Sequence, residues 1–368
     1  MRVLIYGVNS QNKGAQLLLA AVAQRLLAAG HVPVVSSRDV TRSSRKEFQA
    51  VGMFAIERLG ALRSAGLDWI PRSVDGLIPI VGDSQFDYVV DASGFSLTDS
   101  WGMPPVNSRL SRLARWTRHG IGFTMLPQAF GPFTRNDVAS GVKKVVDYAD
   151  WVWARDGVSL GHLGALGSTT PLSLAPDITI GLSVESPSDV AAGKTILVPN
   201  WNLAERSGDG GRERYVESLA TIARTLVEDG GEVVGMSHEG ERDLQLIQEV
   251  AARVPRMAVL SPASGVECKR IIAGSSSVIA GRYHALVSAL SSGVPAIGHS
   301  WSHKYAALMD DFAVDNGLAD PLIPSETIER VRSLDLGAER IRLGGIHSSV
   351  VARIDGVWDQ LATFTRGA

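Results

Sequence analysis

The chain has 368 residues, of which 45% are hydrophobic and 20% charged, and its formal net charge is −2. This length fits two domains that each bury a core, and the balanced charge excludes a general attraction to nucleic acid. The single cysteine, Cys268, excludes an internal disulfide and suits a reducing compartment. Neither a signal peptide nor a stretch of roughly 20 apolar residues is visible, so we expect a cytoplasmic protein without a membrane span.

Strand-like and helix-like segments alternate along the first half of the chain. Apolar residues predict a first strand at Arg2–Val8, and an apolar spacing of four residues predicts a helix over Ala15–Ala29. The later strands of this half are expected at Val32–Ser36, Tyr88–Ala92, Gly120–Leu126 and Trp151–Ala154. The polar segment Ser186–Gly193 is the best candidate for a linker between two domains.

The same alternation restarts after the linker candidate. Strands are predicted at Thr195–Pro199, Glu232–Met236, Met257–Leu260, Ser277–Ala280 and Ala296–Gly298. Helices are predicted at Arg214–Glu228, Arg242–Arg253, Val266–Ala273, Ala285–Leu290, Tyr305–Asp311 and His347–Phe364. The Gly-rich segment Glu205–Arg214 is expected to be a mobile surface loop.

These patterns predict an α/β protein with two Rossmann-like domains, each an open parallel sheet covered by helices on both faces. The predicted boundaries are 1–185 for the first domain, 186–345 for the second and 346–368 for a C-terminal helix. Ligands of such sheets bind beyond the carboxyl ends of the strands. We therefore expect the site in a cleft between the two domains.

The densest group of reactive side chains follows the strand predicted at Ser277–Ala280. Gly281–His284 would open a helix, whose N-terminus favours anions. Arg282 can grip a carboxylate or phosphate with two parallel hydrogen bonds, and His284 can transfer protons near neutral pH. The alternative is that both residues are structural, as a helix cap and a core histidine.

The next strand-end loop carries His299, His303 and Lys304. Two consecutive loops would therefore bring cationic side chains to one edge of the sheet. Histidines four residues apart share a face only within a helix, and no carboxylate completes a metal-binding pattern. We predict no metal here, and we expect Lys304 to be a second cation for an anionic ligand.

Polar side chains also follow strands in the first half. Asn12 and Lys13 lie in the first such loop and could bind a polyol, although a surface turn explains them equally well. Asp91 ends a buried strand and could accept hydrogen bonds from sugar hydroxyls or serve as a base. An arginine recurs every third residue at Arg109, Arg112, Arg115 and Arg118. On a helix these spread over half of the surface, which favours a solvated helix over a basic face for an anionic membrane.

Short motifs are distributed over nearly the whole chain, at Asn12–Ala15 (NKGA), Pro127–Pro132 (PQAFGP), Ala154–Asp156 (ARD), Ala175–Asp177 (APD) and Gly281–Leu286 (GRYHAL). Gly293–Pro295 (GVP) and Lys304 follow the last of them. Together these motifs resemble the polysaccharide pyruvyl transferase family. The chain departs from that family after Asp91, where a run of glycines is common and Ala92–Phe95 (ASGF) stands instead.

This resemblance implies a fold like that of the GT-B glycosyltransferases. It also implies transfer of the enolpyruvyl group of phosphoenolpyruvate to a sugar of a cell-surface glycan, exopolysaccharide or lipid-linked precursor, with a pyruvate ketal as product. No cofactor and no metal would be needed. His284 would be the general acid and base, and the donor would be held by Arg155, Arg282 and Lys304. Sugar contacts in the first domain would come from Asn12, Lys13, Asp91 and Gln128.

Two other functions stay open on the sequence. One is a GT-B glycosyltransferase that uses a nucleotide sugar, because a fold does not fix a function. The other is a non-catalytic carbohydrate-binding subunit. The acceptor sugar and the oligomeric state are not specified by any motif. If the acceptor is lipid-linked, we expect at most peripheral contact with the inner face of the membrane.

Overall fold

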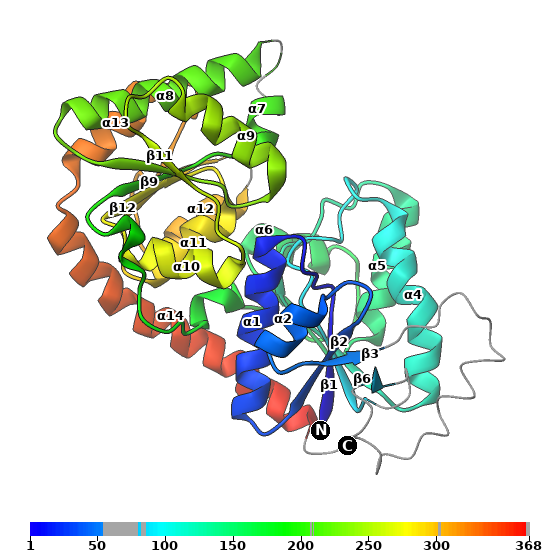
Figure 1. Ribbon diagram of the computed structural model, residues 1–368. Coiled ribbons are helices and arrows are strands. Elements are labelled where there is room, and N and C mark those ends of the chain that lie inside the picture. The colour runs from blue at the N-terminus through cyan, green and yellow to red at the C-terminus, as the bar shows by residue number, and fades with distance from the viewer. Residues whose placement is uncertain (54–79, 82–85, 207, 209, 301–302, 366–368) are drawn as a thin grey trace. The chain divides into compact units, whose positions relative to one another are not determined.

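The computed structural model describes residues 1–53, 80–81, 86–206, 208, 210–300 and 303–365 (Figure 1). They form two compact units. The first comprises Met1–Ser10, Ala15–Ile178 and Arg353–Ala368, and the second comprises Gln11–Gly14 and Thr179–Ala352. The sequence places the boundary between domains at 185/186, whereas the units divide between Ile178 and Thr179.

The first unit is built on an eight-stranded sheet in the order β4-β3-β2-β1-β5-β6-β7-β8. Its strands are β1 (Arg2–Tyr6), β2 (Val32–Ser36), β3 (Val51–Met53), β4 (Ile80–Val81), β5 (Tyr88–Asp91), β6 (Gly122–Gln128), β7 (Trp151–Ala154) and β8 (Leu172–Leu174). Every neighbouring pair is parallel. Strand order reverses between β1 and β5, so the crevice that binds ligands in such sheets lies at their carboxyl ends.

Helices cover both faces of the first sheet. They are α1 (Lys13–Ala28), α2 (Arg42–Glu47), α4 (Met103–Arg118), α5 (Asn136–Tyr148) and α6 (Gly157–Gly164). Figure 1 shows α1 on one side of the strands and α4 with α5 on the other. Side chains of α4, α5 and α6 share one core with the sheet, in which Trp116 and Phe123 pack with ring centroids 5.5 Å apart.

The second unit is built on a six-stranded parallel sheet in the order β11-β10-β9-β12-β13-β14. Its strands are β9 (Thr195–Val198), β10 (Val233–Met236), β11 (Ala258–Leu260), β12 (Ser277–Ala280), β13 (Ala296–His299) and β14 (Leu318–Ala319). All four residues of β12 are buried, as expected for a strand covered on both faces. Strand order reverses between β9 and β12, which pair directly.

Helices again lie on both faces, with α8, α9 and α13 on one side of the sheet and α10 and α11 on the other (Figure 1). The helices are α7 (Trp201–Arg206), α8 (Gly211–Glu228), α9 (Gly240–Ala251), α10 (Gly265–Gly274), α11 (Tyr283–Ser291), α12 (His303–Asp311), α13 (Pro324–Ser333) and α14 (Leu336–Thr365). Short 3-10 helices span Ile178–Gly181 and Asp189–Ala191. Helix α14 passes from the second unit into the first, at 352/353.

The predicted linker Ser186–Gly193 is docked on the second unit rather than extended between units. Ser188 N donates to Arg270 O over 2.9 Å, and Arg270 Nε donates to Ser186 O over 3.2 Å. Gly274 permits this approach, since a Cβ there would lie 2.1 Å from Ser188 O. A polar composition predicts a loop but does not report the hydrogen bonds that fix it.

The predicted loop Glu205–Arg214 is also more helical than expected. Helix α7 extends to Arg206 and α8 begins at Gly211, while residues 207 and 209 lie outside the described part of the chain. Gly210 adopts a left-handed φ of 66° as the N-cap of α8, and the buried side chains that follow anchor that helix. Among the described residues, no helix combines the length and apolar character that a bilayer span requires.

Candidate functional site

The reversal point of the second sheet is fixed by a close approach of two strand ends. Gly281 follows β12, and its carbonyl accepts hydrogen bonds from Asn200 Nδ2 at 2.7 Å and Tyr305 OH at 2.8 Å. A Cβ on Gly281 would lie 2.8 Å from Leu203 Cδ1 and 2.9 Å from Asn200 Cβ, so only glycine fits. The chain then turns directly into α11, with Arg282 as its N-cap residue.

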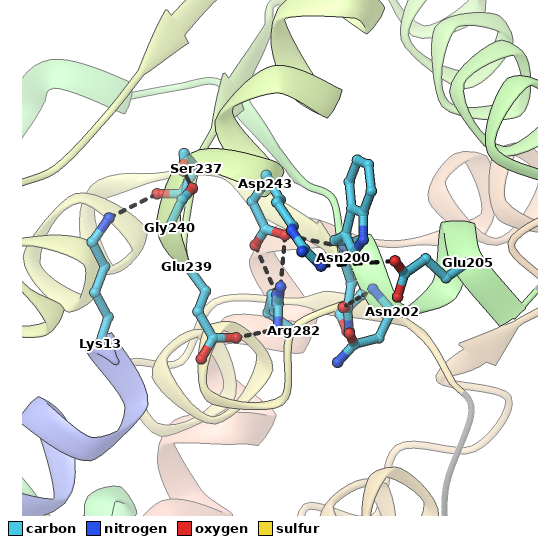
Figure 2. Close-up of polar contacts among 12 residues, drawn as sticks. Lys13, Asn200, Asn202, Glu205, Ser237, Glu239, Gly240, Asp243 and Arg282 are labelled. Carbon is cyan, nitrogen blue, oxygen red and sulfur yellow. Dashed lines mark hydrogen bonds and ion pairs between the residues drawn. The ribbon is translucent and has the colours of Figure 1, made fainter. Parts of the chain in front are cut away.

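Arg282 is held by two carboxylates of the neighbouring α9 segment (Figure 2). Asp243 accepts from Nε at 2.7 Å and from Nη2 at 2.6 Å, and Glu239 accepts from Nη1. Burial works to lower the pKa of Arg282, but Asp243 and Glu239 outweigh it and raise the pKa above its ordinary value. At least three of the five N–H donors are therefore engaged, and the guanidinium is charged and oriented.

The two carboxylates differ in burial. The Asp243 side chain is 0% exposed, and its Oδ1 also accepts from Trp201 N at 3.0 Å. The Glu239 side chain is 26% exposed. Asp243 is thus a buried support for Arg282, whereas the ion pair of Glu239 with the same guanidinium is partly open to solvent.

The first loop of the chain contributes to this site, because Gln11–Gly14 groups with the second unit. Lys13 Nζ donates to Ser237 O at 3.2 Å, just beyond the end of β10 (Figure 2). Gly14 lies against His284, since a Cβ on Gly14 would be 2.4 Å from His284 Nδ1. The structure thereby brings Lys13, predicted as a sugar contact of the first domain, together with Arg282 and His284.

Lys304 lies at the first turn of α12, beside aromatic rings. Its Nζ is 5.1 Å from the ring centroid of Tyr283 and 5.6 Å from that of Tyr305. These are cation–π distances. Tyr283 in turn meets the ring of His284 edge to face, with centroids 5.3 Å apart. The expected convergence of Lys304 with the α11 segment is therefore observed.

A second histidine, His238, was missed by the sequence reasoning. It follows β10, between Ser237 and Glu239, and is 2% exposed. Burial lowers its pKa well below the ordinary value, and the charges of His284, Arg282 and Lys13 lower it further. Its position two residues after the predicted strand Glu232–Met236, at the carboxyl edge of the same parallel sheet as Gly281, is the signal that could have found it.

The remaining predicted residues lie in the first unit, and Asp91 is buried there. It is 0% exposed; Oδ2 accepts from Arg109 Nε at 2.6 Å, and Oδ1 accepts from Ser93 N at 3.0 Å. A carboxylate this buried needs a paired cation. Arg109 provides it and is itself 2% exposed, so it does not belong to a solvated or basic helix face. Asp91 forms a buried ion pair with Arg109, and its contact with a sugar stays a prediction.

Arg155 and Gln128 are buried in the same unit. Arg155 Nη1 donates to Asp177 Oδ2 at 2.7 Å, and both side chains are at most 3% exposed. Gln128 is 0% exposed and its Nε2 lies 3.4 Å from Asp91 O. The roles of Arg155, Gln128 and Asn12 in ligand binding stay predictions.

Three solved structures are similar to the whole chain. HepE of Anabaena in complex with UDP and glucose has a TM-score of 0.64 at 13% identity, covering 100% of both chains. The UDP-GlcNAc 2-epimerase of Neisseria meningitidis bound to UDP-GlcNAc gives 0.59 at 11%, covering 98% of this chain and 100% of that one. MnaA of S. aureus with UDP gives 0.58 at 11%, covering 97% and 96%.

At these identities the similarity shows the fold, which is GT-B, as the sequence predicted. The family model for polysaccharide pyruvyl transferase matches residues 12–303. The chain belongs to the polysaccharide pyruvyl transferase family. No curated protein matches the chain.

Proposed function

We propose that the protein transfers the enolpyruvyl group of phosphoenolpyruvate to two hydroxyls of a glycan sugar, forming a pyruvate ketal and releasing phosphate. Family membership supports a transferase that acts in polysaccharide biosynthesis. The observation that carries the finer proposal is the group of Lys13, Arg282 and His284 at the N-terminus of α11. A small ligand with a carboxylate and a phosphate suits two cations and a helix N-terminus.

The reaction needs proton transfer at both ends. The methylene carbon of the donor gains a proton, and its C2 forms bonds to two sugar oxygens while the C2–O bond to phosphate breaks. One hydroxyl proton finishes on the new methyl group and the other on the phosphate. His284 is our candidate for this transfer, because it lies beside Gly14 and Tyr283 at the cationic group. The proposal includes no metal and no cofactor.

A nucleotide-sugar transferase is the second candidate. The solved structures named above hold UDP or a UDP-sugar on the same fold. A donor of that kind would place its diphosphate at the same helix N-terminus. The two candidates therefore differ in the ligand that the α11 segment accepts.

Thermal shift of the full chain separates the two. At roughly 100 times its Kd, a ligand stabilises the folded state by about 2.7 kcal/mol. We expect phosphoenolpyruvate to raise the melting temperature and UDP, GDP and UDP-sugars to leave it unchanged. Lys13→Met should weaken the shift, whereas Lys143→Met, at an exposed ion pair with Asp147, should not.

A shift with a nucleotide and none with phosphoenolpyruvate would overturn pyruvyl transfer and favour the second candidate. A third possibility, a carbohydrate-binding subunit without catalysis, is addressed by His284→Gln. This substitution should abolish release of phosphate from phosphoenolpyruvate while binding persists. No phosphate release by the wild type with any glycan acceptor would favour the binding subunit.

A further inference from the structure

The segment Ser237–Glu239 passes along the cationic group with a contact on each side of His238. Ser237 O accepts from Lys13 Nζ at 3.2 Å, and Glu239 pairs with Arg282. Figure 2 shows these two contacts on successive parts of one loop. His238 therefore stands between these two contacts in the sequence, and the charges of Lys13, Arg282 and His284 act on its ring. The proposed reaction gives it no role.

The His238 ring is buried, yet one of its polar atoms has no partner in the described part of the chain. The residue is 2% exposed, and Nε2 makes no hydrogen bond there. Buried polar atoms are normally hydrogen-bonded, so each exception calls for an explanation. An anion held by Lys13 and Arg282 would supply the missing acceptor.

We propose that His238 is a donor-binding residue, whose neutral ring donates a hydrogen bond from Nε2 to an anionic oxygen of phosphoenolpyruvate. This inference rests on the proposed function. The two histidines then have different roles. His284 transfers protons, while His238 binds the donor without changing its own protonation state. Burial and the neighbouring cations keep the pKa of His238 well below neutrality, which is consistent with a neutral donor at physiological pH.

The chain offers a matched control in His299, at the end of β13. It is 0% exposed, and burial lowers its pKa to about 4. Like His238, it leaves one ring nitrogen without a partner among the described residues, in this case Nδ1. Its Nε2 lies 3.1 Å from Thr327 Oγ1, and the charged groups that act on it are Asp320 and Arg330. His299 thus matches His238 in burial and differs in its surroundings.

The test is the Kd of phosphoenolpyruvate for the full chain, measured by titration calorimetry. His238→Leu and His238→Met remove the donor and should weaken binding at least about tenfold, as for a lost hydrogen bond to a charged group. His238→Gln keeps an N–H donor and should stay within about threefold of the wild type. His299→Leu should bind like the wild type. The ratio of the Kd of His238→Gln to the Kd of the wild type should be constant from pH 6 to 8.

Wild-type affinity in both donor-free variants would overturn the inference and leave the proposed function intact. So would equal weakening in His238→Gln and His238→Leu, because a residue that only fills space is not rescued by a donor. A ratio that changes with pH would assign a titrating role to His238 and would also overturn it. No binding of phosphoenolpyruvate by the wild type would overturn the proposed function first, and this inference with it.

Discussion

At the scale of single residues, the site is defined by the two carboxylates that pair with Arg282. Asp243 is buried and fully engaged by Arg282 and Trp201, so it orients the guanidinium. Glu239 is partly exposed and contacts the Nη1 edge. An anionic donor that uses this edge competes with Glu239, and it leaves Asp243 in place.

Glu239→Gln should therefore tighten the binding of phosphoenolpyruvate. The substitution keeps the shape of the side chain and removes the competing charge. A partly exposed ion pair contributes up to about 1 kcal/mol, which corresponds to a Kd about two- to fivefold lower, measured by calorimetry. Glu205→Gln is the control, since Glu205 pairs with Arg242 rather than Arg282. An unchanged or higher Kd in Glu239→Gln would mean that the donor does not use this edge.

At the scale of elements, the site depends on how closely the first loop approaches α11. Gly14 is the second residue of α1, and its Cα faces His284 with no room for a methyl group. Gly281 likewise allows β12 to end against Asn200. Gly14 thus permits the close approach of the first loop to His284, and Gly281 permits that of β12 to Asn200.

Gly14→Ala should displace His284 while leaving the unit folded. A Cβ at 2.4 Å from Nδ1 forces the imidazole to move, and catalysis tolerates little displacement of a proton-transfer group. We expect release of phosphate from phosphoenolpyruvate to fall by about 100-fold, with a small change in melting temperature. Gly344→Ala in α14, where a Cβ meets nothing within 4 Å, is the control. Full activity in Gly14→Ala would show that the reaction does not depend on the position of this ring.

At the scale of the whole molecule, two buried neutral histidines make the second unit sensitive to acid. The folded-state pKa of His299 is about 4, and that of His238 is also well below the ordinary 6.5. Between the folded-state pKa of each histidine and the ordinary value of 6.5, the unfolded chain binds a proton that the folded chain does not. The stability contributed by each neutral ring is therefore complete above pH 6.5 and is lost as the pH falls.

His299→Gln should reduce this pH dependence. For His299 alone, the lowered pKa corresponds to a decrease in the free energy of unfolding of up to about 3 kcal/mol between pH 6.5 and pH 4. Native-state hydrogen exchange of the β12 and β13 amides measures the opening free energy of this unit without assuming two-state unfolding of the whole chain. The free energy of His299→Gln should decline less steeply on acidification than that of the wild type. If the opening free energies of the wild type and His299→Gln decline in parallel with pH, His299 does not cause the loss of stability in acid.

The sequence could predict what is encoded locally. The strand Ser277–Ala280 and the helix after it follow from apolar patterning and from the Gly281–Arg282 turn, and both are observed. The partners of Arg282 could not be predicted, because Glu239 and Asp243 lie 43 and 39 residues away. The Asp91–Arg109 pair was missed for a similar reason, since periodicity reports a helix face and not its neighbour.

The allocation of Gln11–Gly14 to the second unit has a practical consequence for recombination. A gene fragment for residues 179–352 would encode His238, Arg282 and His284, yet it would lack Lys13 and Gly14. A chimera of two family members joined near Ile178 would combine the first loop of one parent with the α11 segment of the other. Inheritance of the proposed anion-binding group thus requires both segments from the same parent, although more than 160 residues separate Gly14 from Thr179.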